Sequence, residues 1–184
     1  MIDFSRPADV VAPELLGCVI THGGVSVRLT EVEAYLGAED AAAHTYRGMT
    51  PRNAAMFGPP GRLYVYLSYG IHLAGNIVCA PEGTGQGCLL RAGEVVAGHD
   101  IAYRRRGDVP AARLASGPGN LGKTLGLSLE DNGTPVTLEL PEEAPEWVAG
   151  PRIGISKNVD APWRFWIPGD TSVSGRRGRP RRNS

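Results

Sequence analysis

Residues 25–35 carry a pattern of apolar and polar side chains that predicts a β-strand with an unusual end. Val27 and Leu29 alternate with polar residues at the period of two that is typical of a half-buried strand. If the alternation continues, Glu31 and Glu33 follow on the same core-facing side. A carboxylate that faces the core is costly unless it is paired, hydrogen-bonded or in use. The pattern therefore predicts a polar site at this strand end, although surface exposure is the plainer interpretation of a lone glutamate.

The chain that follows this strand is expected to turn back toward it. Tyr35 lies on the same predicted face, and Leu36-Gly37 then breaks the strand. Residues 38–44 read as a loop or helical turn that would bring His44 near the strand end. A carboxylate, a phenol and an imidazole so close in sequence could form a small site, whereas a lone histidine is more often solvated or packed in the core.

A second strand pattern, over residues 62–80, is rich in tyrosine. Tyr64 and Tyr66 share one face, Tyr69 lies on the other, and Gly70 interrupts the alternation before Ile71–Cys79 resumes it. Aromatic residues are ordinary in strands, so packing explains any one of them. Together with the first stretch, however, the cluster suggests flat rings on a rigid platform, which is what stacking on a nucleobase requires.

The remaining pattern predicts short elements joined by Gly- and Pro-rich turns. Further helices are expected over residues 7–16, from 51 after a Thr50 cap, and over 120–127, and further strands at about 15–20, 135–140, 152–155 and 164–167. Short strands with few helices predict an α+β fold, namely a single compact domain with a curved, mainly antiparallel β-sheet and short surrounding helices.

Charge divides the chain into two parts. The 184 residues balance 19 bases against 19 acids, but five arginines and no acid lie in residues 171–184. The body, residues 1–170, is therefore mildly acidic, with 14 bases against 19 acids, and is expected to form one folded domain. The Gly-, Pro-, Ser- and Arg-rich tail is expected to be disordered; it could hold phosphates or simply aid solubility.

The cysteine and hydropathy patterns indicate in which cellular compartment the protein works. Cys18, Cys79 and Cys88 lie in apolar runs without C-x-x-C spacing, so we expect reduced core thiols. No apolar run is long enough to cross a bilayer, and the N-terminus has neither a basic nor an apolar leader region. A soluble, cytoplasmic protein without a membrane partner is expected.

Several long motifs resemble one known family, the alkyladenine (3-methyladenine) DNA glycosylases, which are monofunctional base-excision repair enzymes. The resemblance covers nearly the whole body. The matching stretches are TEVEAYLGAEDAAAH (30–44), MTPRN (49–53), AAMFGPPGRLYVYLSYGIHLAGN (54–76), GCLLRAGE (87–94), ASGPGNLGKTLGL (115–127), PRIGIS (151–156) and WRFWI (163–167).

The resemblance implies an activity and a partner. Such enzymes flip a damaged nucleotide out of duplex DNA and hydrolyse its N-glycosidic bond, which leaves an abasic site. Alkylated or deaminated purines are the implied substrates: 3-methyladenine, 7-methylguanine, and also hypoxanthine or ethenoadenine. The implied partner is double-stranded DNA containing damaged purines, bound by a monomer that works at the bacterial nucleoid.

The resemblance also implies the roles of individual residues. Glu33 would be the general base that activates water, while Glu31 would be structural or would tune the local charge. Arg91 and the backbone carbonyl of Ile153 would help to place the water. Tyr35 and Tyr66 would sandwich the base, with His44 closing the pocket edge, Asn76 excluding normal guanine by a clash with its amine, and Tyr69 inserting into the duplex.

The implied chemistry needs few groups. An alkylated purine is cationic and leaves readily, so one base and one oriented water can suffice, and electron-rich rings attract such a cation. No cofactor and no metal are expected, since no His, Cys and Asp set has ligand spacing. The two lysines, Lys123 and Lys157, lie outside the first motif, which argues against a Schiff base and strand cleavage.

Other functions remain open from the sequence. A non-catalytic DNA-damage binding protein would keep the tyrosines but lose the base, and Glu33 and Arg91 argue against it. A hydrolase of free nucleosides would need the pocket without an exposed Tyr69. RNA binding would rest on fold analogy alone. Phosphate contacts are expected from arginines near the motifs, namely Arg47, Arg52, Arg62 and 104–106, and from the glycine-rich stretch 116–123.

Overall fold

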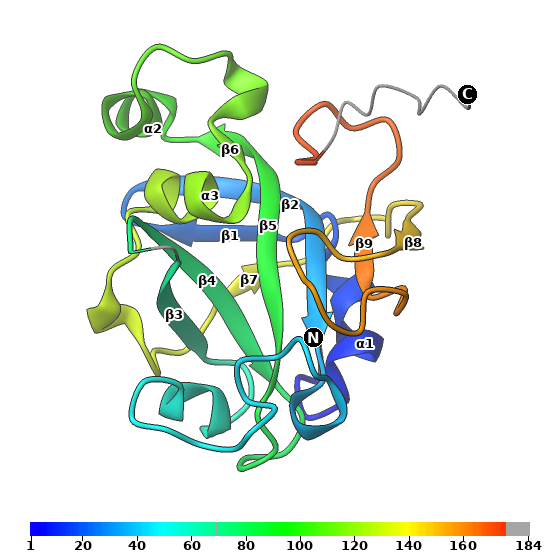
Figure 1. Ribbon diagram of the computed structural model, residues 1–184. Helices are drawn as coiled ribbons and strands as arrows, with labels where there is room; N and C mark the ends of the chain where they lie inside the picture. Colours follow the sequence, from blue (N-terminus) through cyan, green and yellow to red (C-terminus); the bar gives the residue numbers. More distant parts are fainter. Residues whose placement is uncertain (69, 176–184) are drawn as a thin grey trace, which may run out of the picture.

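The computed structural model describes residues 1–68 and 70–175, which form one mainly antiparallel sheet with short helices around it (Figure 1). The strand order is β3-β4-β5-β2-β1-β7, with β6 beside β5 and β9 between β2 and β8. This arrangement confirms the predicted α+β class. The strands are β1 (Val19–His22), β2 (Val25–Tyr35), β3 (Leu63–Ser68), β4 (His72–Cys79), β5 (Gln86–Ala97), β6 (Ala115–Ser116), β7 (Leu138–Glu139), β8 (Val148–Gly150) and β9 (Arg164–Trp166).

The helices of the described residues are short and cover the sheet. They are α1 (Ala8–Val11), α2 (His99–Arg106) and α3 (Pro118–Leu125), and α1 continues as a 3-10 turn over Ala12–Leu15. Figure 1 shows α3 lying across β4 and β5. A Cβ at Gly122 would overlap the Leu73 carbonyl, so α3 reaches β4 this closely because residue 122 has no side chain. None of the helices in this part of the chain is both long and apolar enough to span a membrane.

Strand β2 is a central strand of the sheet, with neighbouring strands on both of its edges. It pairs with β5 along nearly its whole length, and on its other edge it pairs first with β1 and then with β9. The register with β5 shifts on both sides of Glu31, as at a β-bulge. Residues 29–34 are therefore all buried, and two of them, Glu31 and Glu33, are acidic.

Two predicted elements are wrong. Residues 152–155 are not a strand but a series of bends, because the Arg152 side chain and the Ile153 amide bond to side chains of the site instead of a neighbouring strand. The helix expected from residue 51 is a turn followed by a 3-10 turn over Ala54–Phe57, where Asn53 instead of Thr50 takes the cap position.

The expected boundary at residue 170 does not mark the end of ordered contacts. Ser172 and Ser174 are buried, and the amide of Ser174 donates to a Glu31 carboxylate oxygen. Ser172 and Ser174 therefore pack on the domain, and the disorder of the tail stays a prediction. The rest of the expected disordered tail, residues 176–184 with its five arginines, lies outside the described residues.

Candidate active site

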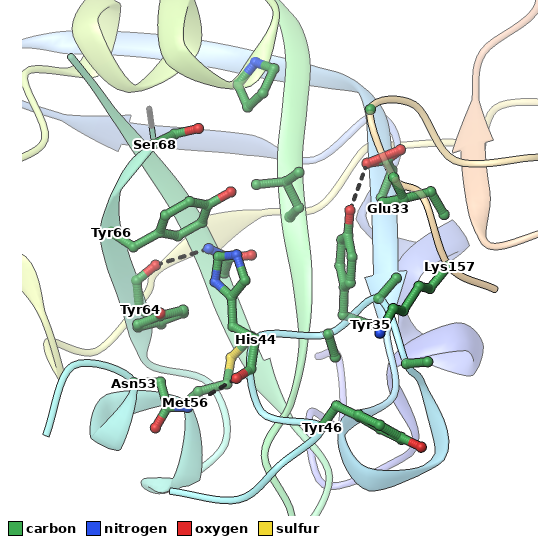
Figure 2. Close-up of a pocket in the computed structure, with 18 of the residues that line it drawn as sticks. Glu33, Tyr35, His44, Tyr46, Asn53, Met56, Tyr64, Tyr66, Ser68 and Lys157 are labelled. Carbon is green, nitrogen blue, oxygen red and sulfur yellow. Dashed lines mark hydrogen bonds between the residues drawn. The ribbon is translucent and has the colours of Figure 1, made fainter. Parts of the chain in front are cut away.

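The residues predicted from the two informative stretches meet in one pocket of about 960 Å³. Figure 2 shows Tyr66 and His44 on one side of it and Tyr35 and Glu33 on the other. Tyr69, the predicted duplex-inserting residue, lies outside the described residues. The predicted residues that line the pocket are Glu33, Tyr35, His44, Tyr66, Asn76, Arg91 and Ile153.

Glu33 is fully buried and both of its carboxylate oxygens accept hydrogen bonds. Oε1 accepts from the Tyr35 hydroxyl at 3.1 Å and lies 3.5 Å from Nη1 of Arg91, and Oε2 accepts from the Ile153 amide at 2.8 Å. Burial raises the pKa of Glu33 above its ordinary value, the neighbouring Glu31 adds to the rise, and the three contacts oppose it. A carboxylate held in this way is poised to take a proton.

Glu31 is the anchor of a second buried network beside Glu33. It accepts from Nε of Arg91 at 3.1 Å, from Nε of Arg164 at 2.7 Å and from the Ser174 amide at 2.6 Å. Nε of Arg91 also lies 3.2 Å from the Ser174 hydroxyl. This network holds the guanidinium of Arg91 beside Glu33.

The aromatic residues form a braced wall. The ring of Tyr66 stacks on Tyr64 with centroids 5.7 Å apart, and His44 meets Tyr66 edge-on at 4.5 Å. Burial and the nearby charge of Arg52 lower the pKa of His44, so its imidazole is neutral at neutral pH. Asn76 is buried, and its side-chain amide donates to the Tyr64 carbonyl at 3.2 Å. The rings and the Asn76 amide on this side of the pocket are therefore uncharged and hold one another by direct contacts.

Sequence reasoning missed a buried ion pair, Asp40–Arg152, that joins two segments of the pocket wall. The two side chains are fully buried and form two hydrogen bonds, at 2.6 and 2.8 Å. It also missed Arg164 and Ser174, the partners of Glu31. All of these contacts join residues more than a hundred positions apart, so no local pattern could have revealed them.

The expected phosphate-binding arginines fall into three groups, one of which is Arg104 alone, exposed and 3.6 Å from Asp100. Arg47 and Arg52 line the pocket, and so does Lys157. By contrast, Arg62, Arg105 and Arg106 donate to backbone carbonyls of the protein itself. The location of Lys157 also weakens the sequence argument against a lysine nucleophile, because a residue outside the first motif lines the same pocket as Glu33.

A family model described as methylpurine-DNA glycosylase (MPG) matches residues 2–171. The fold and the site, taken with this match, define the class of protein as a DNA glycosylase, a hydrolase of N-glycosyl bonds that serves in the repair of alkylated bases. More particularly, the chain belongs to the methylpurine-DNA glycosylase family.

Its curated relatives match along almost the full length of both chains. A protein of Corynebacterium efficiens named "Putative 3-methyladenine DNA glycosylase" is 72% identical, over 98% of this chain and 97% of its own. Proteins with the same name from Corynebacterium glutamicum and Cutibacterium acnes are 66% and 55% identical, over 98% and 96% of this chain and 98% and 100% of their own.

Proposed function

We propose that the protein removes alkylated purines, above all 3-methyladenine and 7-methylguanine, from duplex DNA by hydrolysis that leaves an abasic site. The observation that carries the proposal is the fully buried carboxylate of Glu33, held by hydrogen bonds inside a pocket walled by tyrosines. Deaminated or etheno-bridged purines, hypoxanthine and ethenoadenine, are proposed as further substrates.

The burial of Glu33 supports the proposal that the damaged nucleotide leaves the duplex. A glycosidic bond inside the base stack is out of reach of a buried carboxylate, so the base must be flipped. Tyr35 and Tyr66 would then stack on the extruded base, and their π-faces would attract a purine made cationic by alkylation. Tyr69 is proposed to fill the gap in the duplex.

The proposed chemical step transfers one proton to Glu33 and replaces the bond between C1′ and the base by a bond to the water oxygen. The oxygen of a water attacks C1′ of the sugar as the bond to the base breaks, the bonding electrons leave with the base, and Glu33 takes the water's proton. A cationic purine becomes neutral as it leaves. Arg91 would orient the water beside Glu33, and the backbone carbonyl of Ile153 would complete its contacts; the Ile153 contact with Glu33 that supports this placement comes from the amide.

Selection against normal bases is assigned to Asn76. Its side-chain amide is held by the Tyr64 carbonyl, and we expect the amine of guanine to meet it there. A clash at that point would disfavour guanine relative to adenine derivatives. 7-Methylguanine carries the same amine, so its release is expected to depend on the ready departure of its cationic base and not on this contact.

We further infer that the enzyme is monofunctional, needs no cofactor or metal, and acts as a monomer at the nucleoid in the cytoplasm. Hydrolysis with Glu33 as the general base needs no covalent intermediate between the protein and DNA. Borohydride added during turnover should accordingly trap no protein–DNA adduct, and an adduct that disappears in Lys157→Ala would show that Lys157 acts as a nucleophile.

The central test is base release in a single turnover from alkylated duplex DNA and from duplexes with one hypoxanthine or one ethenoadenine. Glu33→Gln should lower the rate by at least ~10²-fold, because it removes the general base while keeping the side-chain shape. Glu39→Gln, which changes an exposed glutamate near the same strand end, is the matched control and should leave the rate unchanged.

The other outcomes each point to a different conclusion. Release that survives Glu33→Gln would place the base elsewhere. Lesion binding without release from any substrate would favour a non-catalytic damage-binding protein, and release from free nucleosides alone would favour a nucleosidase.

A further inference from the structure

We propose that Arg152, anchored on Asp40, is the positioning residue for the catalytic carboxylate: it holds in place the two uncharged groups, one on each oxygen, that donate hydrogen bonds to Glu33. The inference rests on the proposed function, because it assigns Arg152 a role that is exerted only through Glu33.

The anchor is the fully buried carboxylate of Asp40. Its two oxygens accept the two ends of the Arg152 guanidinium, Nη1 to Oδ2 at 2.6 Å and Nη2 to Oδ1 at 2.8 Å. The amides of Leu36 and Ala42 donate to the same carboxylate at 3.1 Å each. A bidentate contact of this kind fixes both the place and the plane of the guanidinium. Arg152 therefore has very little freedom to move.

The first group that Arg152 positions is Tyr35. The guanidinium carbon lies 4.6 Å from the centroid of the Tyr35 ring, and Nη1 donates to the carbonyl of Ala34 at 2.9 Å. Both the ring and the adjoining backbone of Tyr35 are thus held by one side chain. The hydroxyl of this ring is the group that donates to Oε1 of Glu33 at 3.1 Å.

The second group is the amide of Ile153, the next residue in the chain. It donates to Oε2 of Glu33 at 2.8 Å. The loop that follows is closed by the same anchor, since Asn158 adopts a positive φ of 51° and its side chain donates to Asp40 at 3.2 Å. The Asp40 carboxylate therefore contacts both ends of the loop 152–158. The amide near the start of this loop, that of Ile153, donates to Glu33.

The choice of arginine supports a geometric role. Nε of Arg152 is buried and has no hydrogen-bond partner among the described residues, which is an unfavourable state for a charged group. Neutralising the charge of Asp40 does not require a buried, planar guanidinium group. Only a planar fork can contact Asp40, the Ala34 carbonyl and the face of Tyr35 at the same time.

The role has a signature in the pH dependence of catalysis. The groups that face Glu33 are Tyr35 and Glu31 from β2, Arg91 from β5 and the Ile153 amide; Arg164 of β9 is paired with Glu31. Burial raises the pKa of Glu33, whereas Arg91 and the two hydrogen bonds lower it. Loosening both hydrogen bonds should raise the pKa further, so that Glu33 takes up a proton at higher pH.

The experiment compares the pH dependence of single-turnover base release for the wild type, Arg152→Gln, Arg152→Lys and the double variant Asp40→Asn/Arg152→Gln. The acid limb of the pH–rate profile is the part in which protonation of Glu33 lowers the rate. It should move to higher pH by about one unit in each of the three variants, the size expected for the loss of a hydrogen bond to a charged group. The double variant removes both charges together, so it leaves no unpaired buried charge and keeps the test open if a single variant fails to fold.

Two controls separate positioning from loss of stability. Asp131→Asn weakens the hydrogen bond with His22, which does not line the pocket, so it should lower the melting temperature without moving the acid limb. In a Tyr35→Phe background, which already lacks one of the two donors, Arg152→Gln should move the limb less than it does in the wild type.

The outcomes distinguish this inference from the proposed function. A wild type that releases no base contradicts the proposed function. A wild type that releases base, together with folded Arg152 variants whose acid limb stays in place, contradicts only the inference. If none of the Arg152 variants folds, the residue is structural and the inference is overturned.

Discussion

Glu33 and Asp40 show how two buried carboxylates in one region can be set for opposite tasks. Burial dominates at Glu33 and raises its pKa, so the charged form is disfavoured in the folded protein. At Asp40 burial acts in the same direction, but the hydrogen bonds from Arg152, Leu36 and Asn158 outweigh it and lower the pKa. One residue is therefore tuned to take a proton, and the other to remain charged and hold its neighbours.

This contrast predicts opposite effects on stability. Glu33→Gln should raise the free energy of unfolding at pH 8 by about 1 kcal/mol, because it removes a charge that the fold disfavours. Asp40→Asn should lower it by about 3 kcal/mol, because it leaves Arg152 buried and unpaired. Denaturant unfolding of both variants and of the wild type measures the two changes.

The pH dependence of these effects follows from the direction of each shift. The cost of charged Glu33 is present above its raised pKa and disappears as the pH falls below the ordinary value of 4.5. The contribution of Asp40 is present above its ordinary value of 3.8 and is lost as the pH falls through the lowered pKa. A Glu33→Gln variant less stable than the wild type at pH 8 would contradict this account.

At the scale of elements, the segment after β9 completes the site. Ser174 contacts three members of the Glu31 network: its amide donates to Glu31, its hydroxyl lies near Arg91, and its carbonyl accepts from Arg164. A stretch without regular secondary structure therefore fixes the arginine that faces Glu33.

Shortening the chain in two steps should separate this role from that of the arginine-rich tail. Removal of residues 176–184 should leave the single-turnover rate at saturating enzyme unchanged, since the contacts of Ser174 remain. Removal of 171–184 should lower the rate by at least ~10-fold, because Arg91 is then without one of its partners and a displacement of about 1 Å at a catalytic group is costly. Equal rates for the two proteins would show that residues 171–175 do not position Arg91.

Some elements follow from the sequence and others do not, for physical reasons. The alternation in β2 placed Glu31 and Glu33 on the core side because side-chain direction in a strand is a local property. Pairings such as Asp40–Arg152 leave no local signal. The strand predicted at 152–155 failed for the same reason, since its side chains and amides bond to distant partners instead of to a ladder.

For the molecule as a whole, a net charge of zero means that binding to DNA must depend on where the cations lie. Arg47, Arg52 and Lys157 line the pocket, so we expect them to meet phosphates beside a flipped nucleotide. Arg104 is exposed and pairs only loosely with Asp100, at 3.6 Å, away from the pocket.

Changing Arg47, Arg52 and Lys157 to alanine together should weaken binding to lesion-containing duplex and flatten its salt dependence. For every phosphate that the variant no longer neutralises, the slope of log binding constant against log salt should fall by ~0.9. Binding titrations at several salt concentrations measure the slope, with Arg104→Ala as the control. An unchanged slope in the triple variant would place the phosphate-binding cations elsewhere.

The Glu31 network also has a consequence for biosynthesis. Glu31 and Arg91 belong to the first half of the chain, but two further partners of Glu31 come from residues 164 and 174. A nascent chain can therefore form much of the sheet while Arg91, the arginine beside Glu33, is still held incompletely. Residue 174 must leave the ribosome before these contacts can form, so incompletely synthesised chains should release damaged bases more slowly than the full chain.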